Sequence, residues 1–196
     1  MSRKAQKKRA AAGKPQRSSR TPTLLFVGVV LVGIIVGLYV FSQPAKAPGN
    51  AGDMAPDFEL QVVTTEGLTD QTVRLSDYEG KVVVLEFMTS WCHVCQEMEP
   101  SIVSLYHKYG GQDVVFLSVA GTQRNATAES TAAFIREYGA TWTHVLDTDN
   151  SVFSKYGATA TPTYFVLDKS GTILSRFEGV VITDAFYKAI DLALST

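Results

Sequence analysis

Cysteine is scarce in this chain, whose 196 residues contain only Cys92 and Cys95. One pair cannot form the several disulfides that hold small secreted scaffolds together. Histidine is scarce too, and a zinc site needs four ligands at short spacing, which His93, His107 and His144 do not offer around this pair. A purely structural disulfide is the alternative, but so short a loop would stabilise the fold little. We therefore expect the two thiols to exchange electrons.

Acidic residues are absent from the first 52 positions. All 19 of them fall from Asp53 onward, whereas eight of the 18 basic residues precede position 23. The remainder of the chain holds ten basic against 19 acidic residues, a net formal charge of −9, which argues against nucleic-acid binding. We predict that residues 1–22 are a basic cytoplasmic tail that meets anionic lipid.

Charged residues are also absent from residues 23–41. At ~1.5 Å per residue a helix of that length nearly crosses a bilayer's hydrocarbon layer, so the segment predicts a transmembrane signal anchor. Cleavage as a signal peptide is the alternative, and Pro48 after Ala47 disfavours it. Residues 42–52 are expected to be a linker and residues 53–196 one domain. The positive-inside rule then predicts a single-pass protein of the plasma (inner) membrane, with its domain outside the cytoplasm.

Regular elements are expected on both sides of the cysteine pair. The apolar run 82–88 predicts a buried central strand, and residues 96–109 have apolar positions near helical spacing. If Cys92 opens that helix, Cys95 lies one turn on, within disulfide reach, and the helix dipole stabilises a Cys92 thiolate. Pro100 falls inside the predicted helix, where it favours a kink. Further strands are expected at 114–120, 141–146, 164–167 and 172–177, with helices at 129–138, 151–156 and 183–194.

A strand, then Trp91-Cys92-His93-Val94-Cys95, then a helix resembles the thioredoxin superfamily. The resemblance covers roughly residues 53–196 and implies an α/β thioredoxin-like fold, a central mixed sheet flanked by helices. Residues 55–60 and 75–81 resemble the extra N-terminal β-hairpin of its TlpA-like branch, also called ResA-like or DsbE-like, and of peroxiredoxins. Peroxiredoxins are disfavoured, because no second motif with a peroxidatic cysteine is visible.

The resemblance implies a role for each residue of the site. Cys92 would attack a substrate disulfide, Cys95 would resolve the mixed disulfide, and Glu86, at the family's buried-acid position, would exchange a proton with Cys95. Thr161-Pro162 matches the family's cis-proline, which lies against the dithiol and leaves the residue 161 backbone free to pair with a substrate strand. The expected substrate-binding residues are Trp91, His93, Val94 and Thr161.

A TlpA-like protein would reduce disulfides of exported proteins and need a membrane thiol donor of the DsbD or CcdA type. Beyond the redox-active disulfide it would need no cofactor and no metal. Members that reduce apocytochrome c commonly carry a glutamate three residues after the second cysteine, where this chain has Met98. General disulfide reduction is therefore favoured. The alternatives are a disulfide oxidase, a metal-binding or copper-delivery protein of related fold with His144 as its only distal ligand candidate, and a catalytically idle adhesion or chaperone module.

Overall fold

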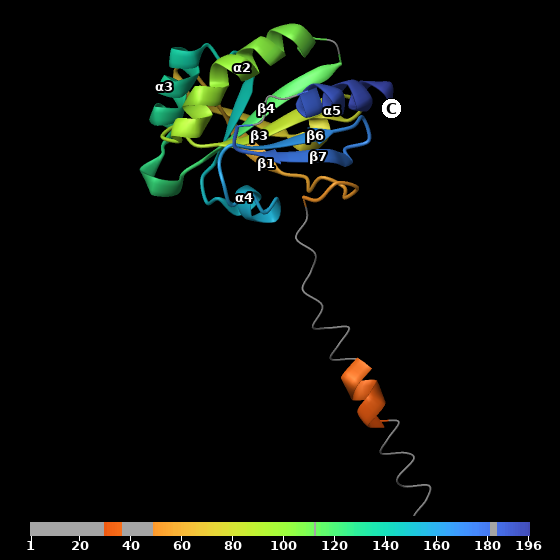
Figure 1. The fold of residues 1–196 in the computed structure, drawn as a ribbon. Helices are drawn as coiled ribbons and strands as arrows, with labels where there is room; N and C mark the ends of the chain where they lie inside the picture. Colours follow the sequence, from red (N-terminus) through yellow and green to blue (C-terminus); the bar gives the residue numbers. More distant parts are fainter. Residues whose placement is uncertain (1–29, 37–48, 112, 181–183) are drawn as a thin grey trace, which may run out of the picture. The chain divides into compact units, whose positions relative to one another are not determined.

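The computed structural model describes residues 30–36, 49–111, 113–180 and 184–196 (Figure 1). The chain divides into two units, Met1–Ala45 and Lys46–Thr196. Residues 30–36 of the first unit are helical. Among the described residues, no helix combines the length and the apolar character needed to cross a membrane. The predicted tail 1–22, most of the predicted anchor 23–41 and most of the linker 42–52 lie outside the described residues.

A seven-stranded mixed sheet forms the centre of the second unit, in the order β2-β1-β5-β4-β3-β6-β7. β3 and β4 run parallel, as do β4 and β5, and every other neighbouring pair is antiparallel. The expectation of a mixed sheet is confirmed. The strands are β1 (Glu59–Thr64), β2 (Gly67–Arg74), β3 (Val82–Met88), β4 (Val114–Gly121), β5 (Thr143–Asp147), β6 (Thr163–Leu167) and β7 (Ile173–Glu178).

Helices cover both faces of this sheet because its central strand is buried on both sides. Along β3 the odd residues, such as Phe87, pack in a cluster with Val152 and Phe153 of α4 (Ser151–Lys155). The even residues, such as Val84, face the other helices, as the two-residue period of a strand requires. Figure 1 shows α4 on one side of the sheet and α2 and α5 on the other. The helices of that second side are α2 (His93–Tyr109), α3 (Ala128–Tyr138) and α5 (Asp184–Ser195).

Two helix ends show how local sequence sets these elements. α2 begins at His93, three residues before the predicted start, because Cys92 serves as its N-cap and accepts a hydrogen bond from the Cys95 N–H. α3 ends where predicted, at Gly139, which takes the left-handed conformation with φ of 68° that glycine adopts without strain. α2 continues through Pro100, where the helix lacks one backbone donor.

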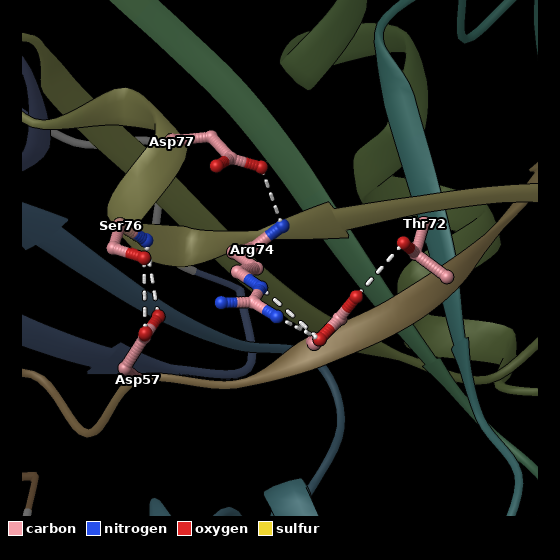
Figure 2. Close-up of polar contacts among 6 residues, drawn as sticks. Asp57, Thr72, Arg74, Ser76 and Asp77 are labelled. Atoms are coloured by element: carbon pink, nitrogen blue, oxygen red, sulfur yellow. Dashed lines mark hydrogen bonds and ion pairs between the residues drawn. The ribbon is translucent and has the colours of Figure 1, made fainter.

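β1 and β2 form an antiparallel hairpin at one edge of the sheet. Figure 2 shows its polar contacts with the turn that leads into β3. The Arg74 guanidinium donates to Glu59 at 3.0 and 2.7 Å, and the Arg74 N–H donates to Asp77 at 2.8 Å. The Ser76 N–H and hydroxyl both donate to Asp57, at 3.0 and 2.9 Å. These bonds tie the two strands of the hairpin to each other and to the turn that precedes β3, the strand that leads to the dithiol.

Replacing Arg74 should change stability only slightly, although its ion pair is well formed. Both side chains are about half exposed, and an exposed pair contributes about 0.2–1 kcal/mol because water screens it. Chemical denaturation of Arg74→Ala should lower the free energy of unfolding within that range. A loss well above ~1 kcal/mol would show that the hairpin anchors the domain more strongly than its exposure allows.

Candidate active site

Cys92 and Cys95 form a disulfide at the N-terminus of α2, with 5.2 Å between their Cα atoms. Cys92 is the N-cap, and the Cys95 N–H donates to its sulfur at 3.2 Å. Free amide groups and the helix dipole stabilise negative charge at this position. Cys95 has no exposed surface, whereas 5% of Cys92 is exposed. Cys92 is therefore the sulfur that is stabilised as a thiolate and that an incoming disulfide can reach.

The segment before β6 lies against this disulfide, 69 residues further along the chain. Cys92 Sγ is 3.3 Å from the Thr161 carbonyl oxygen. The Thr161–Pro162 peptide bond is cis, which confirms the conformation predicted from the sequence. Pro162 is buried and Thr161 is partly exposed. Thr161 and Cys92 thus share one small stretch of surface where a substrate chain can approach the reactive sulfur.

Glu86 is buried within β3, as predicted, with 2% of its surface exposed. Its Oε2 accepts a 2.7 Å hydrogen bond from the Ser118 hydroxyl, which in turn accepts one from Trp142 Nε1 at 2.8 Å. Burial raises the pKa of Glu86, and the hydroxyls of Ser118 and Tyr164 lower it by smaller amounts. A carboxyl with a raised pKa can take up and release a proton near neutral pH.

Sequence reasoning missed a second buried acid, Glu99 of α2, which has no exposed surface. Neither of its carboxyl oxygens has a hydrogen-bond partner among the described residues. Burial raises the pKa of Glu99, and the charge of Glu86 raises it further. One signal was available in the sequence: Glu99 follows Cys95 by four residues, so a helix places both on one face.

Trp91 lies at the rim of the site and is 38% exposed. Its indole Nε1 donates to the Gln123 carbonyl oxygen at 2.7 Å, and the Arg124 guanidinium carbon lies 4.6 Å from the centroid of its ring. Arg124 has a φ of 51°, an uncommon conformation for a residue with a side chain. The loop after β4 therefore fixes the tryptophan beside the dithiol, a contact that the sequence pattern does not reveal.

The two residues between the cysteines point in different directions. His93 is exposed, and its Nε2 lies 3.1 Å from Glu97 Oε1, one helical turn away. Val94 is partly buried and packs against the cluster that contains both cysteines. His93 is thus open to an approaching partner, and Val94 helps to support the motif from below.

The structure does not bring the distal histidine to the thiols. His144 is buried in β5, separated from β3 by β4, and its Nδ1–H donates to the Trp142 carbonyl oxygen at 3.0 Å. Burial lowers the pKa of His144 to about 4, which keeps its ring neutral. Across the described ranges, no three His, Cys, Asp or Glu side chains are grouped so as to hold a metal ion. A dithiol beside a buried acid is suited instead to disulfide exchange.

Comparison with known proteins places this site in a family. Residues 51–176 match the model of the AhpC/TSA family. The chain is 30% identical over 168 residues to the thiol-disulfide oxidoreductase ResA of Geobacillus kaustophilus, covering 86% of this chain and 91% of that one. It is 27% identical over 179 residues to the thiol:disulfide interchange protein HelX of Rhodobacter capsulatus, covering 88% and 96%.

A solved structure agrees with these sequence relatives. A provisionally assigned thiol:disulfide interchange protein DsbE from Chlorobium tepidum superimposes with a TM-score of 0.65 at 28% identity, covering 74% of this chain and 99% of that one. The relatives are named for disulfide exchange, and this chain carries a dithiol at the start of the helix that follows the central strand. The chain therefore belongs to the AhpC/TSA family, as a thioredoxin-fold thiol-disulfide oxidoreductase of the TlpA, ResA and DsbE type.

Proposed function

We propose that this protein is a membrane-anchored reductase that breaks disulfides of exported proteins outside the cytoplasm. The observation that carries the redox part is the position of Cys92 Sγ at the N-terminus of α2, 3.3 Å from the Thr161 carbonyl oxygen. The membrane part is supported by the uncharged residues 23–41 that follow eight basic residues. The Cys92–Cys95 disulfide is itself the redox centre, so the reaction needs no further cofactor.

The reaction follows from the placement of the two sulfurs. The Cys92 thiolate attacks one sulfur of the substrate disulfide, which forms a mixed disulfide and releases the other substrate sulfur as a thiolate. Glu86 accepts the proton of Cys95, and the Cys95 thiolate attacks Cys92 Sγ. The mixed disulfide breaks, so the substrate gains two electrons and the Cys92–Cys95 disulfide forms. Each released substrate thiolate takes up a proton.

Trp91, His93 and Thr161 are proposed to contact the substrate because they surround Cys92 and are at least partly exposed. Val94 and Pro162 would shape the floor of that contact. A membrane protein of the DsbD or CcdA type is the proposed electron donor, since cytosolic thioredoxin cannot cross the bilayer.

The redox potential of the Cys92–Cys95 pair decides the direction of electron flow. We expect a glutathione titration of the purified protein to give a potential below about −200 mV, nearer that of thioredoxin than that of DsbA. Such a value favours reduction of substrates, because electrons then flow from the dithiol to most exposed disulfides. A potential close to about −120 mV, the value for DsbA, would instead identify a disulfide oxidase.

A labelling experiment tests the location. In intact cells, Cys92 of the full chain should react with a membrane-impermeant maleimide after mild reduction, and the protein should stay with the membranes after carbonate extraction. A cytosolic thiol protein in the same cells serves as the control and should stay unlabelled. Labelling of Cys92 only after cell lysis would refute a location outside the cytoplasm.

A further inference from the structure

Glu99 lies opposite Glu86, between two apolar clusters that place α2 along β3. In one cluster Cys95 of α2 packs with Met88 of β3. In the other, Ile102 of α2 packs with Val84 of β3. Glu99 lies between Cys95 and Ile102 on the helix, and Glu86 lies between Met88 and Val84 on the strand. The two buried carboxyls therefore lie at the same level of the interface between α2 and β3, next to the cluster that contains both cysteines, and the charge of Glu86 acts on Glu99.

A row of polar side chains crosses the sheet at this level. Tyr164, Glu86, Ser118 and His144 are neighbours on β6, β3, β4 and β5. Ser118 donates to one oxygen of Glu86, whereas Glu86 Oε1 has no hydrogen-bond partner among the described residues. Tyr164 is paired with Glu86 across β6 and β3, and burial, with the charges of Glu86 and Glu99, raises its pKa. Glu99 thus completes a polar layer between two apolar ones.

Two buried carboxyls whose charges interact cannot both be ionised without a large cost in free energy. No basic group is bonded to either one among the described residues: Glu86 accepts one hydrogen bond, from the Ser118 hydroxyl, and Glu99 accepts none. The pair must therefore keep at least one proton over a wide pH range. Since Ser118 donates only to Glu86, the charge is better stabilised on Glu86 and the proton on Glu99.

We propose that Glu86 and Glu99 form one acid-base pair behind Cys95, in which Glu86 exchanges the proton with Cys95 and Glu99 holds a second proton that it passes on through Glu86 once Glu86 has lost its own. This proposal deepens the proposed function, because it rests on Glu86 as the proton acceptor. Two carboxyls whose surroundings separate their proton affinities can divide the roles of base and acid. Glu99 is a positioning residue here, since it acts through Glu86 and Cys95.

The proton count of the cycle is consistent with this division. During substrate reduction, Cys95 gives its proton to Glu86 and then attacks Cys92 Sγ. During recharge, a thiolate of the donor attacks Cys92 Sγ and forms a mixed disulfide with it, the Cys92–Cys95 bond breaks, and Cys95 leaves as a thiolate that needs a proton. The second thiolate of the donor then attacks its own sulfur in the mixed disulfide and releases Cys92 as a thiolate. While protonated, Glu86 supplies the proton that Cys95 needs. Once rising pH has removed that proton, Glu99 supplies it through Glu86, and solvent restores it.

The groups that face the pair define the expected pH dependence. They are Tyr164 from β6, Ser118 from β4, Cys95 from α2 itself and Tyr138 from α3, whose pKa the Glu99 charge helps to raise. As the pH rises, neither tyrosine loses its proton before Glu86 does, because burial raises the pKa of both tyrosines. The pair is therefore the group that titrates first behind Cys95, and Glu86 loses its proton before Glu99.

The kinetic test uses recharge of the Cys92–Cys95 disulfide by dithiothreitol in the full chain. The measured quantity is the ratio of the rate constant of Glu99→Gln to that of the unchanged protein. The pH dependence of the reductant cancels in this ratio. We expect this ratio to be near one at about pH 6 and to fall roughly tenfold at about pH 9, a modest share of what general acid catalysis supplies. Glu137→Gln, an exposed glutamate of α3, is the control and should give a flat ratio. A flat ratio for Glu99→Gln would overturn the proposal.

A second measurement does not depend on activity. Carbon-13 NMR of the glutamate side-chain carboxyls should show Glu99 losing its proton at a lower pH in Glu86→Gln than in the unchanged protein, because the neighbouring charge is gone. An unchanged Glu99 titration would overturn the pair even if disulfide reduction is normal. A shifted titration together with an unchanged rate of substrate reduction in Glu86→Gln would refute Glu86 as the proton acceptor, and with it the acid-base roles proposed for the pair.

Stability gives a third readout for Glu99→Gln. A carboxyl whose pKa is raised by folding stabilises the native state fully at low pH, and that contribution is lost as pH rises through the raised pKa. Glutamine cannot ionise. The thermal midpoint of Glu99→Gln should therefore exceed that of the unchanged protein by an amount that grows from acidic to alkaline pH. A difference that stays constant with pH would contradict a proton held on Glu99.

Discussion

Cys92→Ser should lose all disulfide reductase activity, leaving only the uncatalysed reduction of insulin by dithiothreitol. Cys92 Sγ is the attacking atom, and the chain has no other thiol at its surface, because Cys95 is fully buried. The serine hydroxyl is not ionised at neutral pH, so the N-terminus of α2 cannot make it a nucleophile as it does a thiol. Insulin precipitation followed by turbidity measures the loss.

Cys95→Ser is the matched variant, because it should keep the first step and lose the second. Cys92 would attack a substrate disulfide as before, but no thiol would follow to release the product. A mixed disulfide with the substrate should accumulate on non-reducing gels and disappear on addition of dithiothreitol. Mixed disulfides trapped by Cys92→Ser instead would reverse the two roles. Full turnover by Cys92→Ser would remove the dithiol from the mechanism altogether.

The local part of this site could be predicted from the sequence. Cys92-His93-Val94-Cys95 lies after an apolar run and before a helical pattern, and these short-range features determine that Cys92 caps the helix and Cys95 lies one turn on. The resemblance of Thr161-Pro162 to the cis-proline of the thioredoxin superfamily predicted its cis bond. Glu86 was expected to be buried, because apolar residues surround it in the strand.

The remaining parts depend on long-range packing, and the sequence does not determine them. Glu99 comes to the level of Glu86 only because Cys95 shares a cluster with Met88, and Ile102 shares one with Val84, where α2 packs on β3. A sequence pattern predicts that α2 has a buried face, yet not which strand residue each position meets. The contact of Arg124 with Trp91 is similar, since it depends on a positive φ in a loop 33 residues away.

Phe87→Ala should cause the largest loss of stability among single replacements in β3. The side chain has no exposed surface and lies among three rings, with centroids 5.0 Å from Phe153, 4.9 Å from Tyr156 and 5.6 Å from Phe165. Truncation removes buried apolar surface and leaves a cavity, which for a buried phenylalanine lowers the free energy of unfolding by about 3–5 kcal/mol. Phe87→Leu fills most of that space and should cost less. Leu68→Ala, at an exposed position of β2, should cost about 0.5 kcal/mol or less.

The two faces of β3 make this replacement informative about the site as well. Phe87 packs toward α4, whereas Glu86, one residue earlier, lies on the opposite face of the strand, the face that α2 covers. If the strand only positions Glu86, folded Phe87→Ala at low temperature should reduce insulin with nearly normal pH dependence, although denaturation shows a much weaker fold. A pH profile displaced in Phe87→Ala as far as in Glu86→Gln would show that the proton chemistry depends on the packing of the whole strand. The two measurements therefore separate the stability that Phe87 supplies from the proton transfer that Glu86 supplies.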